Sequence, residues 1–461
     1  MIKHTKSRKG DYKVAGIFFK FPFFRDTFLG TSLVFLVSFF ENNSLWFIPL
    51  VLIILASKFG VSISFSIIGI LSYSFIFSTM LLSGFAMILV RSISDFLYLK
   101  DSRKIYENYS GAIVFVIMLS FMVGNVLFRA YQYKTLAVWL FVSFSVLQTV
   151  LLFVGAIEKT HALVLPVLFI FSSLIILFKI FGNIINEKYL LVIISFSMGF
   201  LTFIANSIIT KHLRISTHLK FDFLHYARKY PELLLIAFFY YFSYWIDNII
   251  MWFKKGLEVA PNIIISPNYD FPLFIAAISF TPAIVLFSLG IETTFLKKYL
   301  SFFSAIKNNK TLEQIEARLE EIQASMKHIL LETTLVAITI AILDLSASKF
   351  LNKWLSKFSI TVFRLGAIGH LFNVIFMLML TIHLYFNFYK EAFIGVLISF
   401  SVNLILTAFC RSMAPGLGFL LAFFSGSVFL LRKMNLKDLV FKIYSSQQHG
   451  LEKVERISWR P

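Results

Sequence analysis

The stretch ISFSIIGILSYSFIFSTMLLSGFAMILV, residues 63–90, decides the fold class because it holds 28 residues without a charged side chain. About 20 apolar residues are enough for a helix to cross roughly 30 Å of hydrocarbon. Lys58 and Arg91 flank the stretch, so a charged residue marks each end. The pattern therefore predicts a transmembrane helix.

The composition of the whole chain agrees with this prediction. Of its 461 residues, 58% are apolar and only 15% are charged, whereas soluble domains are typically about 45–50% apolar and about 25% charged. The mean hydropathy is +0.81, and there are 57 Phe residues. A water-soluble fold of this size cannot bury so many apolar side chains, so a soluble multidomain enzyme and a disordered chain are both excluded.

Apolar runs bounded by charges predict about twelve spans, so the expected fold is an all-α polytopic membrane protein. The longest polar interruption, residues 210–231, divides the spans into two six-helix bundles at 28–209 and 232–431, with basic cytoplasmic ends at 1–27 and 432–461. Two such halves are common among secondary transporters. The predicted spans are residues 29–56, 63–90, 111–128, 135–157, 162–181, 189–209, 232–253, 271–290, 329–345, 363–386, 391–410 and 413–431.

The basic residues predict the topology. Placing both termini in the cytoplasm puts 31 of the 43 Lys and Arg residues on the cytoplasmic side, as the positive-inside rule requires. The same distribution explains the formal net charge of +19. The charge is spread over many short loops and not gathered in a basic stripe with stacking aromatics, so the lipid bilayer is an expected partner and nucleic acid is not.

One cytoplasmic segment, residues 311–328, has the pattern of an amphipathic helix. Thr311 and Gln314 form a capping-box pattern at its start. A narrow apolar seam follows at helical spacing: either it packs on the protein's own cytoplasmic face, or it docks a cytoplasmic partner. The seam residues are Leu312, Ile315, Leu319, Ile322 and Met326.

No sequence motif indicates catalysis. The chain has no G-x-x-x-x-G-K-[ST], H-E-x-x-H or G-x-S-x-G run. Its nine His residues do not fall at metal-ligand spacing, and Cys410 is the single cysteine. We therefore expect no metal site, no cofactor and no enzymatic activity.

Polar residues inside the spans are the candidates for function, because an ionisable group in hydrocarbon usually faces a cavity or a partner. Glu41 lies in the first predicted span, beside Asn42 and Asn43. Asp247 and Asn248 lie in the seventh, in the aromatic-rich segment YYFSYWIDNIIMWF.

Aromatic faces combined with carboxylate or amide groups suit a carbohydrate, so a substrate path is predicted at Asp247, Glu41, Trp245, Tyr244 and Asn248. The alternative is an interfacial aromatic belt, with Asp247 paired to a basic residue. Arg91 and Asp95 are expected to pair on one helix face.

The stretch YDFPLFIAAISFTPAIVLFSLGIETTF, residues 269–295, resembles the PelG-type family of exopolysaccharide export proteins. Weaker echoes are Trp245–Asp247, the stretch from Arg91 to Tyr98, and Ala15–Ile17. Glu41 departs from the family, which has small residues in that region. The matching positions include Tyr269, Asp270, Pro272, Phe274, Ala276, Pro282, Phe287, Ile291, Glu292, Thr293 and Phe295.

This resemblance implies the polysaccharide-flippase branch of the multidrug/oligosaccharidyl-lipid/polysaccharide exporter superfamily. It implies export of an amino-sugar-rich, Pel-like polymer across the bacterial inner membrane during biofilm matrix synthesis. The implied partners are the polysaccharide, a cytoplasmic glycosyltransferase and membrane proteins that respond to cyclic di-GMP. The alternatives are a flippase for lipid-linked oligosaccharide or a small-molecule exporter, and a non-transporting scaffold of the synthase.

Overall fold

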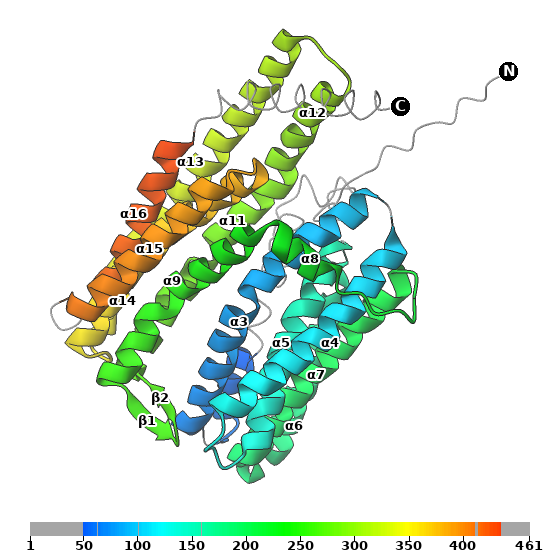
Figure 1. The fold of residues 1–461 in the computed structure, drawn as a ribbon. Helices are drawn as coiled ribbons and strands as arrows, with labels where there is room; N and C mark the ends of the chain where they lie inside the picture. Colours follow the sequence, from blue (N-terminus) through cyan, green and yellow to red (C-terminus); the bar gives the residue numbers. More distant parts are fainter. Residues whose placement is uncertain (1–48, 62, 100, 158, 411–413, 435–461) are drawn as a thin grey trace. The chain divides into compact units, whose positions relative to one another are not determined.

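The computed structural model describes residues 49–61, 63–99, 101–157, 159–410 and 414–434 (Figure 1). Glu41 lies outside these residues, as do the basic segments at both ends. The chain forms two compact units that divide between Phe271 and Pro272, and each is described by itself. This division keeps the helix after the 210–231 linker with the first unit, so the six-plus-six arrangement stays a prediction.

The first unit is helical apart from one small hairpin. An apolar helix at Pro49–Lys58 precedes the labelled elements. The unit then contains α3 (Phe65–Tyr98), α4 (Ser102–Leu127), α5 (Lys134–Ala156), η2 (Thr160–Leu163), α6 (Val164–Phe181), η3 (Gly182–Ile184), α7 (Glu187–His212), α8 (Asp222–Lys229), α9 (Pro231–Lys255), β1 (Leu257–Ala260) and β2 (Ile263–Ile265).

Side-chain caps begin three of the long helices. The side chains of Ser64, Asp101 and Asn186 accept hydrogen bonds from backbone N–H groups in the first turns of α3, α4 and α7, which satisfies donors that a helix leaves unpaired. Helix α5 packs against α3, α4 and α7, and α3 also packs against α9. The core of this unit therefore lies around α5 and α3.

Polar contacts join helix ends and loops of this unit at its two opposite ends. At one end, Glu187 accepts hydrogen bonds from Tyr131 at 2.6 Å and from Ser64 at 3.2 Å. At the other end, the Tyr226 hydroxyl of α8 donates to Asp95 near the end of α3 at 3.0 Å. Asp95 also forms the predicted ion pair with Arg91 at 3.8 Å. Successive helices therefore alternate in direction, as a series of membrane crossings requires.

The β1–β2 hairpin lies against the start of α3. The Ser66 hydroxyl donates to the Val259 carbonyl at 2.7 Å. A Cβ atom on Gly69 would come within 2.8 Å of the Val259 side chain, so a larger residue there would have to displace the hairpin.

The second unit is entirely helical in the part that the structure describes. Its core includes Ala276, Ala283, Ala337, Ala341 and Ala367, small residues that let α11, α13 and α14 approach closely. Its elements are the end of α10 (Pro267–Ser279), α11 (Thr281–Gly290), the π-helical turn η4 (Ile291–Phe295), α12 (Leu296–Lys307), α13 (Leu312–Leu351), α14 (Lys357–Tyr385), α15 (Tyr389–Cys410) and α16 (Leu417–Lys433).

Helix α13 differs from the sequence-based expectation. An amphipathic helix at 311–328 and a separate span at 329–345 were predicted, but α13 is one continuous helix of 40 residues. At 1.5 Å per residue it is about 60 Å long, roughly twice the hydrocarbon thickness. No Pro or Gly interrupts it, and the change from charged to apolar residues does not by itself break a helix.

Nine helices among the described residues are long and apolar enough to cross a membrane, or ten when α10 and the α11–α12 segment, bent by 41°, count as one span. Most of the first predicted span lies outside the described residues. The last corresponds to α16, which has 17 residues. The chain is therefore a multi-pass membrane protein, and the number twelve stays a prediction.

Candidate functional site

Asp247 lies in the interior of the first unit, where its carboxylate accepts a hydrogen bond from the Tyr269 hydroxyl at 2.6 Å. Both residues are 0% exposed. Asp247 comes from α9 and Tyr269 from the first turn of α10. The predicted path residue and the first residue of the family motif are thus in direct contact.

Asp270, the next motif residue, accepts three hydrogen bonds. Asn248 donates to Oδ1 at 2.7 Å, and the Trp252 indole N–H donates to Oδ2 at 2.7 Å. The backbone N–H of Ser266 also donates to Oδ2, at 2.9 Å. Asn248 and Trp252 are four residues apart on α9, so they share one face of the helix. We call Asp247, Asn248, Trp252, Tyr269 and Asp270 the carboxylate cluster.

Tyr73 of α3 links this cluster to the hairpin. Its ring stacks on Trp252 with centroids 4.9 Å apart. Its hydroxyl donates to the Ile264 carbonyl at 3.1 Å and accepts from the Ile264 N–H at 3.0 Å. Sequence reasoning missed Tyr73, because no local pattern relates it to residues almost 200 positions later in the chain.

Two further predicted path residues lie on α9 just before Asp247. Tyr244 and Trp245 are half-buried, and Trp245 packs edge-on against Phe75 with centroids 6.0 Å apart. Asp247 and Asn248 are buried, so neither forms part of an exposed surface in this structure. Asn248 keeps one buried oxygen without a hydrogen-bond partner among the described residues.

The rest of the family motif forms a bent and locally irregular helix. Pro272 lies inside α10, and Pro282 lies in the first turn of α11. Proline removes a backbone donor and disfavours a straight helix, which explains the 41° bend between these helices. Phe274 is half-buried in α10.

The motif ends in the π-helical turn η4, which contains Glu292 and Thr293. The Thr293 hydroxyl donates to the Leu289 carbonyl at 2.6 Å. The side chains of Glu292 and Thr293 are half-buried. π-Helical turns are rare in proteins, and those that occur are often at functional sites. This one lies at the end of the motif.

The apolar seam predicted on α13 is mostly buried within the protein, and its docking to a partner stays a prediction. Leu312 is 53% exposed, but the other four seam residues are at most 5% exposed. The neighbouring hairpin helix, α12, packs against α13, and Lys298 and Arg318 both bind Glu321, at 2.8 and 2.7 Å. The seam is covered by the protein itself because burial of apolar side chains favours this packing. The covered residues are Ile315, Leu319, Ile322 and Met326.

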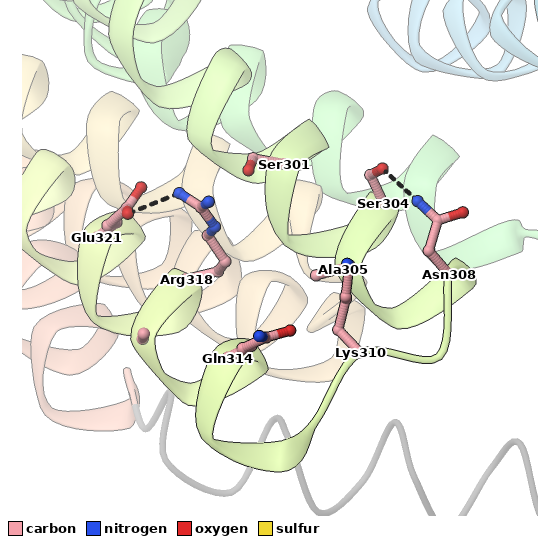
Figure 2. A pocket seen from close by; sticks show the side chains of 9 residues that line it. Ser301, Ser304, Ala305, Asn308, Lys310, Gln314, Arg318 and Glu321 are labelled. Atoms are coloured by element: carbon pink, nitrogen blue, oxygen red, sulfur yellow. Dashed lines mark hydrogen bonds and ion pairs between the residues drawn. The ribbon is translucent and has the colours of Figure 1, made fainter.

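A polar pocket of about 470 Å³ lies near the turn between α12 and α13, and Figure 2 shows the side chains that line it. Arg318 binds Glu321 on one side of it, and the Asn308 amide donates to the Ser304 hydroxyl at 3.2 Å on the other. The pocket contains none of the predicted path residues. Among the described residues, no group of three or more His, Cys, Asp or Glu side chains could hold a metal ion.

The fold is that of a known transporter class. The structure is similar to the eukaryotic MATE transporter AtDTX14, with 14% sequence identity, a TM-score of 0.56 and coverage of 88% of this chain and 95% of that one. It is also similar to an outward-facing multidrug resistance MATE family transporter of the MOP superfamily, with 11% identity, a TM-score of 0.59 and coverage of 88% and 94%.

The sequence adds the family. A family model described as "PelG: Putative exopolysaccharide Exporter (EPS-E)" matches residues 15–444. No protein with a curated description matches the sequence. The chain therefore belongs to the PelG family and is a membrane exporter with a MATE-like fold.

Proposed function

We propose that this protein exports an exopolysaccharide of the Pel type, rich in amino sugars, across the bacterial inner membrane during biofilm matrix synthesis. Membership in a family of exopolysaccharide exporters supports this proposal. In it, about twelve spans form two six-helix bundles, both termini are cytoplasmic, and the polymer passes between the bundles. A cytoplasmic glycosyltransferase delivers the polymer, and membrane partners that respond to cyclic di-GMP regulate its synthesis.

The observation that carries the assignment of a site is the contact between Asp247 and Tyr269 at 2.6 Å. Two carboxylates, an amide and a phenol lie together inside the first unit, and burying them is costly unless they have a role or full pairing. We propose that Asp247 and Asn248 provide polar contacts for the substrate when the path opens, and that Tyr244 and Trp245 provide aromatic faces for sugar rings. Glu41 remains a further candidate for the path.

The test is the amount of secreted polymer in a strain that carries Asp247→Asn. This change keeps the size of the side chain and removes its charge, so export falls if the carboxylate contacts the substrate. Asp101→Asn is the matched control, because Asp101 caps α4 and pairs with the exposed Lys104 in its first turn, and Asn caps a helix equally well. Unchanged secretion by Asp247→Asn at equal protein level would show that the carboxylate has no role in the path.

A second experiment separates the proposal from its alternatives. The purified protein is reconstituted in vesicles without a glycosyltransferase. Movement of lipid-linked oligosaccharide or of small molecules under these conditions would favour a flippase or a small-molecule exporter. Export that requires a co-reconstituted synthase, and that Asp247→Asn lowers, supports polymer export. If the synthase exports the polymer in vesicles that lack this protein, only the scaffold role remains for it.

A further inference from the structure

Residues 213–230, here called the linker strap, connect α7 to α9 and are held tightly against α4. The Glu107 carboxylate is 2% exposed. It accepts from Lys220 Nζ at 2.8 Å, from Arg103 Nε at 2.9 Å and from the Ser216 hydroxyl at 2.9 Å. The hydrogen bond to Glu107 raises the pKa of Lys220 above its ordinary value, so the pair is charged at neutral pH.

The backbone of the strap is held at the same place. The Lys220 N–H donates to the Glu107 carbonyl at 3.1 Å. A Cβ atom on Gly111 would meet the Lys220 carbonyl oxygen at 1.9 Å, so only glycine allows this approach. The Asn108 amide donates to the Asp222 carboxylate at 3.0 Å and accepts from the Asp222 N–H at 2.9 Å. The strap therefore has a defined inner side.

Helix α8 continues this inner side along α4 and onto α3. Phe223 is 1% exposed and lies 5.6 Å from Phe115, measured between ring centroids. The Tyr226 hydroxyl donates to Asp95 at 3.0 Å, and burial together with this carboxylate raises the pKa of Tyr226 to about 12. The strap thus has inner side chains, which contact α3 and α4, and outer side chains, which are exposed.

The outer side presents apolar and basic groups together. Ile215, Leu219, Phe221 and Leu224 are 68%, 52%, 40% and 40% exposed. Arg214 and Arg228 of the strap are exposed as well, as is Lys211 in the adjoining last turn of α7. None of these three forms an ion pair with another described residue. Residues 210–231 contain five basic residues and one acidic residue, and that acid, Asp222, faces inward to Asn108.

The place where the linker strap contacts α4 determines its depth relative to the membrane. It contacts α4 at Glu107 and Gly111, and the long apolar run of α4 begins at Gly111. The strap therefore lies at the level where a membrane helix leaves the hydrocarbon and enters the headgroup region.

We propose that the outer side of the linker strap binds the headgroups of anionic phospholipids. Its apolar side chains enter the acyl boundary. Arg214 and Arg228 of the strap, together with Lys211 at the end of α7, bind the phosphates, as interfacial segments with apolar and basic residues do. The inner contacts hold the strap in the orientation that this requires. The bound lipid in turn stabilises the segment that leads into α9, the helix that carries Asp247.

The test uses the full-length chain in detergent with Cys410→Ser and Leu219→Cys labelled with an environment-sensitive fluorophore. We titrate it with phosphatidylglycerol and, separately, with phosphatidylcholine. Phosphatidylglycerol shifts the emission to shorter wavelength, and raised salt weakens the effect because exposed charges are screened. Changing Lys211, Arg214 and Arg228 to Gln raises the apparent Kd for phosphatidylglycerol by about tenfold or more, since each basic residue near an anionic surface contributes several-fold.

The matched control changes Lys349, Lys353 and Lys357 to Gln, three exposed lysines elsewhere in the chain. This control keeps the wild-type Kd. Equal shifts with both lipids, or equal losses in both triple variants, overturn the proposal. A fluorophore that responds to inorganic phosphate as strongly as to the lipid assigns the site to free anions and also overturns it.

Discussion

At the scale of single residues, the carboxylate cluster is defined by hydrogen bonds to Asp270. Three buried donors end at its two oxygens: the Asn248 amide, the Trp252 indole and the Ser266 backbone N–H. A buried donor that loses its acceptor costs about 1–3 kcal/mol. Asp270 therefore contributes to the stability of the structure through three hydrogen bonds, which its place in the family motif does not indicate.

We expect Asp270→Leu to lower the free energy of unfolding by roughly 3 kcal/mol, because it leaves these donors unpaired. Asp270→Asn keeps one oxygen acceptor and costs less. Thermal unfolding in detergent measures both variants. If the Leu variant is as stable as the wild type, the donors have other partners and the cluster does not hold α9 to α10.

The Tyr269–Asp247 contact is tested by a double-mutant cycle of Tyr269→Phe and Asp247→Ala. The hydrogen bond is 2.6 Å long and fully buried, so we expect a coupling energy of about 1.5–3 kcal/mol. The control cycle uses Tyr109→Phe with Asn206→Ala, whose neutral bond of 2.7 Å gives about 1 kcal/mol. A smaller coupling at Asp247 than at Asn206 contradicts the role of a charged acceptor.

At the scale of elements, α13 shows how packing determines which surface is free. Its first turns follow the amphipathic pattern that the sequence predicts, and Thr311 accepts from the Gln314 N–H at 3.4 Å as expected. The pattern itself does not identify what covers the seam. In the structure the protein itself covers most of the seam, and only Leu312 at its start is exposed among the five seam residues.

We expect Ile322→Ala to destabilise the α12–α13 hairpin by about 2–4 kcal/mol, because Ile322 is 0% exposed and the change leaves a cavity. Leu312→Ala at the exposed end is the control and changes stability little. Limited proteolysis near residues 308–311 measures the opening of the hairpin. Equal cleavage in both variants contradicts packing of the seam within the protein.

Close backbone contact between the linker strap and α4 gives a further prediction. Gly111→Leu places a side chain where the Lys220 carbonyl lies, so the strap moves away and its amide hydrogens exchange faster. Gly199→Leu is the control, since nothing lies within 4 Å of its added Cβ. Hydrogen exchange of peptides from residues 213–230 measures the difference, and equal exchange rates in the two variants argue against the contact.

At the scale of the whole molecule, the alternating direction of successive helices determines on which side of the membrane each loop lies. The linker strap and the β1–β2 hairpin lie at the two ends of α9, a single helix of 25 residues that is about 37 Å long. A helix of this length crosses the membrane once. The two segments are therefore on opposite sides, and the basic residues predict that the strap is cytoplasmic.

We expect Leu257→Cys, in a Cys410→Ser background, to react with an impermeant thiol reagent in intact spheroplasts. Thr217→Cys and Asn309→Cys react only after permeabilisation, because both lie in predicted cytoplasmic turns. Labelling followed by mass shift on a gel measures the three sites. Reaction of Thr217→Cys in intact spheroplasts would reverse the proposed orientation.

The sequence by itself determined the membrane class, the approximate position of most spans and the family, because each depends on local composition or on a continuous motif. Hydrocarbon excludes charges and unpaired backbone groups, so long apolar runs have few structures available to them. The predicted Arg91–Asp95 pair is local too, and the structure confirms it at 3.8 Å.

Only the tertiary structure brought Tyr73 beside Trp252, placed Asp270 at the end of three hydrogen bonds and covered the seam of α13. These contacts join residues from different helices, and helical periodicity fixes the face on which a side chain lies but not the neighbour that it meets. Packing between helices selects that neighbour.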